Sequence, residues 1–165
     1  MSMAQSVLTE LDQEAIATRR LLERIPDEKL DWKPHPKART LGQLAVHIAQ
    51  VQKQVSSMLQ SASGEAKMQP EEVPSTATEI VTMFDDNHIS TKALLGAMSD
   101  EDLVSNWSLM REGQPIFSLP KIGVVRMVVL NHVYHHRGQL STYLRTLDVA
   151  LPSIYGPSAD ENPFF

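Results

Sequence analysis

The segment from Pro120 to Leu147 has the pattern of a long amphipathic helix, and this pattern limits the folds open to the chain. Its apolar residues recur every three or four positions, the spacing of one face of an α-helix. They are Ile122, Val125, Val129, Leu140, Tyr143 and Leu147. In the middle of that face stand His132 and His136, one helical turn apart. Two imidazoles are therefore expected where apolar core side chains would otherwise lie.

Three further segments have a helical pattern, and we predict helices at residues 2–25, 40–60 and 76–98. Pro26 ends the first, and two capping-box pairs begin the second and third: Thr40 with Gln43, and Thr76 with Glu79. The apolar face of the second helix contains a third histidine, His47. Predicted core residues of the third helix are Ile80, Phe84, Ile89, Leu94 and Leu95.

The remaining segments are short or irregular. Residues 61–75 are rich in Gly, Pro and small polar residues and are predicted to form a loop, whereas 99–103 fits a short capped turn. Alternating apolar residues between 107 and 119 indicate a small hairpin or an extended crossover before the last helix. The proline-rich end, 148–165, is expected to pack irregularly on the bundle. We therefore predict an all-α fold, a four-helix bundle that forms a single domain over residues 1–165.

The composition narrows the possible functions. With 165 residues, 42% of them hydrophobic, the chain is long enough to bury one core. The absence of cysteine excludes disulfides, thiolate nucleophiles within the chain and cysteine-ligated zinc. With a net charge of −5, the chain shows no basic surface for nucleic-acid binding. No run of basic residues indicates a membrane-binding surface, and no apolar stretch is long enough to span a membrane. The N-terminus does not resemble a signal peptide, so a cytoplasmic location is expected.

His47, His132 and His136 are the candidate metal ligands. Neutral imidazole is the commonest metal ligand in proteins, and histidines at positions i and i+4 of a helix can converge on one ion. Three of them fill three positions of a zinc site or part of a nickel or iron site, and they leave a position open for water or substrate. The alternative is that these histidines are buried residues satisfied by ordinary hydrogen bonds.

Three other histidines are weaker candidates. His135 has polar helical neighbours and is expected to be exposed; contact with the metal ligands or with a substrate is the alternative. His88 could approach the site but has no paired ligand, and His35 lies in a proline-flanked loop. Beside the ligands, Arg137 is expected at the surface or in a helix pair, and Gln139 could face a substrate pocket. Gly138 is expected to let two helices approach each other closely, and Tyr143 is expected to lie in the core.

Three stretches of the sequence resemble the DinB/YfiT-like proteins: TLGQLAVHIAQ, NHVYHHRGQLSTYLR and LPSIYGPSADE. The similarity extends from about Leu8 to Glu161. It implies a four-helix bundle, a homodimer and one divalent metal ion, nickel or zinc, held by three histidines. Matched position by position, the implied ligands are His47, His132 and His136, the same three residues that the helical patterns single out.

The resemblance leaves the reaction open. Characterised members of this family are mainly S-transferases that use a low-molecular-weight thiol such as bacillithiol or mycothiol. We therefore expect a metal-dependent S-transferase that acts on small electrophiles. A hydrolase with a metal-activated water is the alternative; its general base could be Asp85, Asp86 or Asp160. A third possibility is a non-catalytic binding or interaction protein.

Overall fold

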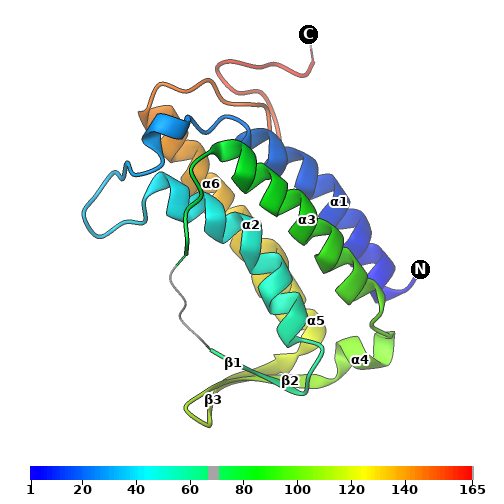
Figure 1. Cartoon of the computed structure of the whole chain (residues 1–165). Coiled ribbons are helices and arrows are strands. Elements are labelled where there is room, and N and C mark those ends of the chain that lie inside the picture. Colours follow the sequence, from blue (N-terminus) through cyan, green and yellow to red (C-terminus); the bar gives the residue numbers. More distant parts are fainter. Residues whose placement is uncertain (67–70, 165) are drawn as a thin grey trace.

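The computed structural model describes residues 1–66 and 71–164 and contains four long helical segments (Figure 1). They are α1 (Met3–Leu22), α2 (Leu41–Met58), α3 (Ala77–Gly96) and a last helix made of three consecutive parts, α5 (Lys121–Val124), η2 (Val125–Asn131) and α6 (His132–Thr146). Helix α2 packs against α3 on one side and against the last helix on the other, while α1 covers α3 and α6. The predicted helical bundle is confirmed.

Local side-chain chemistry explains where these helices begin. The side chain of Thr40 accepts a hydrogen bond from the Gln43 amide, and the Gln43 side chain accepts one from the Thr40 amide. Thr76 and Glu79 form the same reciprocal pair at α3, so both predicted capping boxes exist. The short capped turn is also present, as α4 (Asp100–Val104), and a 3₁₀ turn, η1 (Asp27–Lys29), follows α1.

A three-stranded sheet closes one end of the bundle, so the prediction of a purely helical fold needs correction (Figure 1). Strands β2 (Asn106–Arg111) and β3 (Gln114–Pro120) form the predicted hairpin, and β1 (Ser63–Glu65) pairs with β2 in parallel. The strand β1 lies within the predicted loop 61–75, of which residues 67–70 are outside the described part. Three residues are too few to show an alternating pattern in the sequence.

Gly64 shows why β1 can pair there. A Cβ atom at this position would lie 2.5 Å from Cζ2 of Trp107, which is 1% exposed. Only glycine lets the strand lie this close to the indole ring. The Trp107 Nε1–H donates to the Met58 carbonyl at the end of α2, at 3.3 Å. The tryptophan therefore joins the sheet to the helix that carries His47.

The core occupies the space between the helices and extends beneath the sheet. Leu30 of the predicted connector is buried, and the ring of Trp32 contacts Tyr143 edge-on at 5.6 Å, so both pack on the bundle as expected. The prediction that Ile89 is a core residue is wrong, since its side chain is 67% exposed. The buried residues of α3 follow Ile80 and Phe84 along the opposite side of the helix.

The C-terminal segment 148–164 forms no helix or strand and is tied to the bundle by carboxylates, as predicted for an irregular tail. Glu161 pairs with Arg20 and Arg24 of α1, and Asp160 pairs with Arg145 of α6. In the described part of the chain, no helix combines the length and apolar character needed to cross a membrane.

Candidate metal centre

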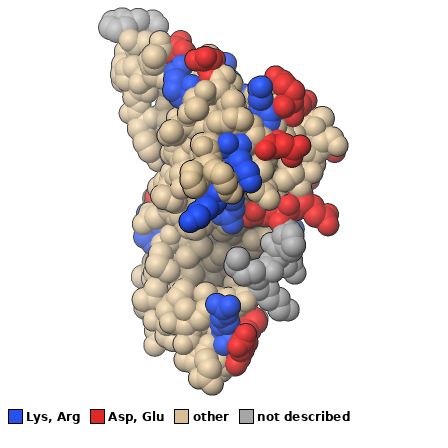
Figure 2. Space-filling model, turned by 90° about the vertical axis from the view of Figure 1, so that its left-hand side faces the viewer, with Lys and Arg blue, Asp and Glu red and all other residues tan. Residues whose placement is uncertain are grey.

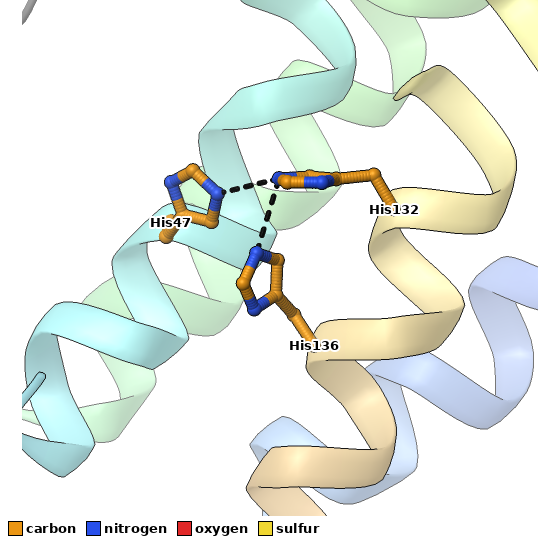
Figure 3. Close-up of side chains that lie close together, drawn as sticks. All are labelled: His47, His132 and His136. Carbon is orange, nitrogen blue, oxygen red and sulfur yellow. Dashed lines mark hydrogen bonds between the residues drawn. The ribbon is translucent and has the colours of Figure 1, made fainter. Parts of the chain in front are cut away.

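Helices α2 and α6 bring the three predicted ligands together (Figure 3). The Nε2 atom of His132 lies 3.0 Å from Nε2 of His47 and 3.0 Å from Nε2 of His136. His136 is buried, and the other two are half-buried. The rings meet edge to face rather than in a stack, so all three nitrogens point at one spot.

The outer nitrogens of two rings determine which tautomers are present. Nδ1 of His47 lies 2.9 Å from Oε1 of Glu71, and Nδ1 of His136 lies 2.7 Å from Oε1 of Gln139. Both partners are acceptors, so each Nδ1 carries the proton and each Nε2 directs a lone pair inward. An Nε2–H of His132 can be donated to the lone pair of His47 or to that of His136, but not to both.

This donor set fits a divalent cation. Nitrogen ligands at about 2.0–2.1 Å from a tetrahedral zinc ion lie about 3.3 Å apart, close to the observed 3.0 Å. A polar hydrogen-bond partner on the outer nitrogen of a histidine ligand is the usual arrangement around protein-bound metals. The cluster therefore suggests a site for a divalent metal.

Burial keeps these imidazoles neutral. It lowers the pKa of His136 to about 4, against the opposing effect of the hydrogen bond to Gln139. The pKa of His47 is lowered by burial and then by the positive charge of Arg39, and that of His132 by burial and then by His47. Only the neutral ring can bind a metal, so all three are ready to do so at neutral pH.

Glu71 is a site residue that the sequence did not reveal. Its Oε1 accepts from His47, and its two carboxylate oxygens also bind the guanidinium group of Arg39, each at 3.2 Å. It belongs to an irregular segment after β1, where no helical or strand period assigns a direction to a side chain. A carboxylate in this position orients the imidazole and increases its basicity as a ligand.

The last helix contains an irregularity beside the site. Its middle part, η2, is a π-helix, and the His132 amide donates to the Met127 carbonyl, five residues back. The predicted continuous α-helix is therefore widened by one residue per turn at this point. Single π turns of this kind are uncommon and occur often at functional sites.

An open groove of about 850 Å³ extends along α2 from Gln43 past His47 to the sheet. Gln50, Gln54 and Met58 line it from α2, Gly64 from β1 and Leu109 from β2. Figure 2 shows the corresponding side of the molecule, where charged side chains gather mainly over the upper half. The groove gives a small molecule access to His47, the member of the histidine cluster that lines it.

Of the remaining histidines, His135 lies beside the cluster, with its ring 5.0 Å from that of His136, whereas His88 does not approach the site as it was expected to be able to do. His135 is exposed, and so is His35, whose Nδ1 accepts from the Lys37 amide. His88 stacks on Phe84, and its Nε2 lies 3.0 Å from Oδ1 of Asp12, on the surface formed by α1 and α3.

The aspartates considered as general bases do not line the groove. Asp85 pairs with Arg19, Asp160 pairs with Arg145, and Asp86 is exposed. In the described ranges, the carboxylates that line the groove are Glu71, engaged by His47 and Arg39, and Glu65 on the sheet side.

Of the two positions expected for Arg137, at the surface or in a helix pair, the surface position is wrong. The residue is 2% exposed, and its guanidinium pairs with Glu14 at 2.7 Å and lies over the rings of Tyr134 and Tyr155. It follows His136 by one position, and this rotation of about 100° directs it to α1 instead of α2. Gly138 is also not a point of close helix approach, because a Cβ there would meet nothing within 4 Å.

Comparison with known proteins identifies the class. The model of the DinB family matches residues 1–162, and the chain therefore belongs to the DinB family. The uncharacterized protein YrdA of Bacillus subtilis (strain 168) is 28% identical over 152 residues, which cover 90% of this chain and 85% of YrdA.

Solved structures show the same fold. A DinB-like protein from Bacillus cereus ATCC 10987 has 26% identity and a TM-score of 0.72, with 92% of this chain and 97% of that one covered. YfiT from Bacillus subtilis, described as a probable metal-dependent hydrolase with an unusual four-helix bundle topology, has 14% identity and a TM-score of 0.67, with 91% of each chain covered.

Proposed function

We propose that this protein is a divalent-metal-dependent S-transferase that joins a low-molecular-weight thiol to a small electrophile. The observation that carries the proposal is the convergence of three imidazole nitrogens, one of which belongs to His47 in the wall of an open groove. Three protein ligands leave at least one coordination position free, which is the feature that separates catalytic from structural metal sites. His47, His132 and His136 would hold the ion, and nickel and zinc are the metals that the resemblance implies.

A divalent metal bound there would lower the pKa of a thiol at its open position and make the sulfur nucleophilic at neutral pH. In the overall reaction, the sulfur forms a bond to an electrophilic carbon, the leaving group departs with its electron pair and the thiol proton is released to water. The chain itself contains no cysteine, so the sulfur has to come from a cosubstrate.

The residues of the groove have separate tasks in this proposal. Glu71 fixes the orientation of His47, and Gln139 fixes that of His136. The carboxamides of Gln50 and Gln54 offer hydrogen bonds along the groove, and Met58 adds an apolar surface about 16 Å from His47, at 1.5 Å per helical residue. We expect an elongated substrate with a polar middle and an apolar end.

Hydrolysis is the second candidate, and it draws support from the likeness to YfiT. A hydrolase of this type uses a general base close to the reacting water. Both oxygens of Glu71 are held by Arg39 and one of them also by His47, so this carboxylate is poorly placed to accept a proton. The geometry therefore favours S-transfer, for which solvent can take the thiol proton.

The test uses the full chain loaded with nickel or zinc. Thioether formation from 1-chloro-2,4-dinitrobenzene is followed with a panel of low-molecular-weight thiols, and release of p-nitrophenol from p-nitrophenyl acetate is followed in parallel. We expect the wild type and His135→Ala to accelerate thioether formation above the spontaneous rate and His132→Ala to lose that acceleration. Acceleration of ester cleavage alone would favour the hydrolase. Inactivity in both assays with a saturated coordination shell would favour a non-catalytic metal-binding module.

Two further expectations accompany this proposal. The resemblance implies a homodimer, and sedimentation of the purified chain would measure its mass in solution. A cytoplasmic location is also expected, and it agrees with the use of a low-molecular-weight thiol, which stays reduced in that compartment.

A further inference from the structure

A buried glutamine links the two helices that carry the histidine cluster. Gln52 on α2 is 7% exposed, and its Nε2–H donates to the Val129 carbonyl of η2 at 2.9 Å. This hydrogen bond matters for the fold, because a buried side-chain amide that is left without a partner destabilises the folded state. This bond lies beside the histidines: Gln52 follows His47 by five residues, and Val129 precedes His132 by three.

The carbonyl that Gln52 binds belongs to the π-helical turn. A π turn contains one residue more than an α turn, so the backbone groups inside it are less regularly paired and can accept a side-chain donor. The His132 amide closes this same turn by donating to Met127. The turn therefore begins at Val125, which is 0% exposed, and ends directly before His132, the first histidine of α6.

We infer that Gln52 is a positioning residue for His132: it holds the π turn whose width sets the direction of this imidazole. The inference rests on the metal centre of the proposed function and not on the reaction. Each residue of an α-helix advances the chain by about 100°. If the π turn closed to an α turn while Val125 stayed in the core, His132 would rotate away from His47 by a large fraction of that angle.

Gln52→Met tests this role. Methionine has a similar length and fills the buried space, but it provides no N–H donor. Gln60→Met is the matched control, since the Gln60 amide also donates to a backbone carbonyl, that of Ser56 at 3.0 Å, away from the cluster. With cobalt(II) as the probe, we expect at least a tenfold weaker affinity and altered visible absorption bands for Gln52→Met, and wild-type values for Gln60→Met. An unchanged affinity and spectrum in Gln52→Met would overturn the inference.

A double variant separates positioning from general structural support. In the His132→Ala background, Gln52→Met should cause no further loss of the residual cobalt(II) affinity, because Gln52 acts through His132. A further tenfold loss in that background would show that Gln52 supports the whole site and would refute the specific role.

A metal-free measurement keeps this question independent of the proposed function. In the apoprotein, ring-proton contacts between His47 and His132 in nuclear Overhauser spectra should be present in the wild type and lost in Gln52→Met. Contacts that persist in the variant would contradict the inference whatever metal the protein binds. Should Gln52→Met fail to fold, Gln52→Asn, which keeps the amide but is one methylene shorter, should fold and show weakened contacts; wild-type contacts there would count against the inference.

Discussion

Glu71→Gln is the most informative single change at the histidine cluster. The introduced carboxamide would keep an oxygen that can accept from Nδ1 of His47, but the change would remove the negative charge that makes this imidazole a stronger ligand. Loss of such an outer partner weakens metal binding about 10–100-fold, or about 1.4–2.7 kcal/mol. Because Arg39 already neutralises part of the Glu71 charge, and the amide retains the hydrogen bond, we expect about tenfold for Glu71→Gln and closer to a hundredfold for Glu71→Ala.

The assay is competition for zinc or nickel with a chromophoric chelator at fixed pH and salt. Glu72→Gln is the control, because Glu72 is the neighbouring residue and carries the same charge. It should bind metal with wild-type affinity. If Glu71→Gln and Glu71→Ala both stay within twofold of the wild type, Glu71 does not support His47, and the tautomer that we assign to that ring loses its main argument.

Other variants test the ligands and the buried arginine. His132→Ala should remove tight metal binding while His135→Ala keeps it, as measured by elemental analysis of untagged protein. The reverse result would mean that His135, and not His132, is the metal ligand. The folded chain holds His136 at a pKa of about 4 against 6.5 for a free imidazole, so the unfolded chain binds more protons between these values. Stability of the metal-free protein should therefore be complete above pH 6.5 and fall by up to about 3 kcal/mol as the pH drops toward 4, with a smaller fall in His136→Leu, as followed by urea unfolding. Arg137→Met leaves Glu14 without its cation and should cost about 3 kcal/mol of unfolding free energy with little effect on metal affinity; a large loss of metal would indicate a role at the site.

The convergence of the three histidines could be predicted from sequence because the information for it is local. His132 and His136 are four residues apart on one helix, and His47 interrupts the apolar face of another. Helical periodicity is enough to direct such side chains toward a common core. The same periodicity failed for Ile89, because a face that is apolar in sequence is buried only if another element covers it, and the position of that element is a tertiary property.

Helical periodicity could not predict the positions of residues that lie outside a regular helix or strand, or whose surroundings come from distant parts of the chain. Glu71 lies in an irregular segment after β1, and its direction is shown only by its tertiary contacts with His47 and Arg39. Arg137 has a charged side chain that a sequence analysis assigns to solvent, yet Glu14 and two tyrosine rings from distant positions enclose it. The π turn has no sequence signal distinct from that of a continuous amphipathic helix, since Val125 and Val129 fit both.

The groove is completed by a part of the fold that does not carry the histidine cluster. The histidines come from helices that the whole bundle holds in place, whereas the groove is completed by Gly64 of β1 and Leu109 of β2. These strands belong to a small sheet at one end of the fold, where a change in loop length or in one side chain alters the pocket without disturbing α2 and α6. Substrate choice should follow residues such as Met58 and Leu109, and metal affinity should follow the histidines and their partners.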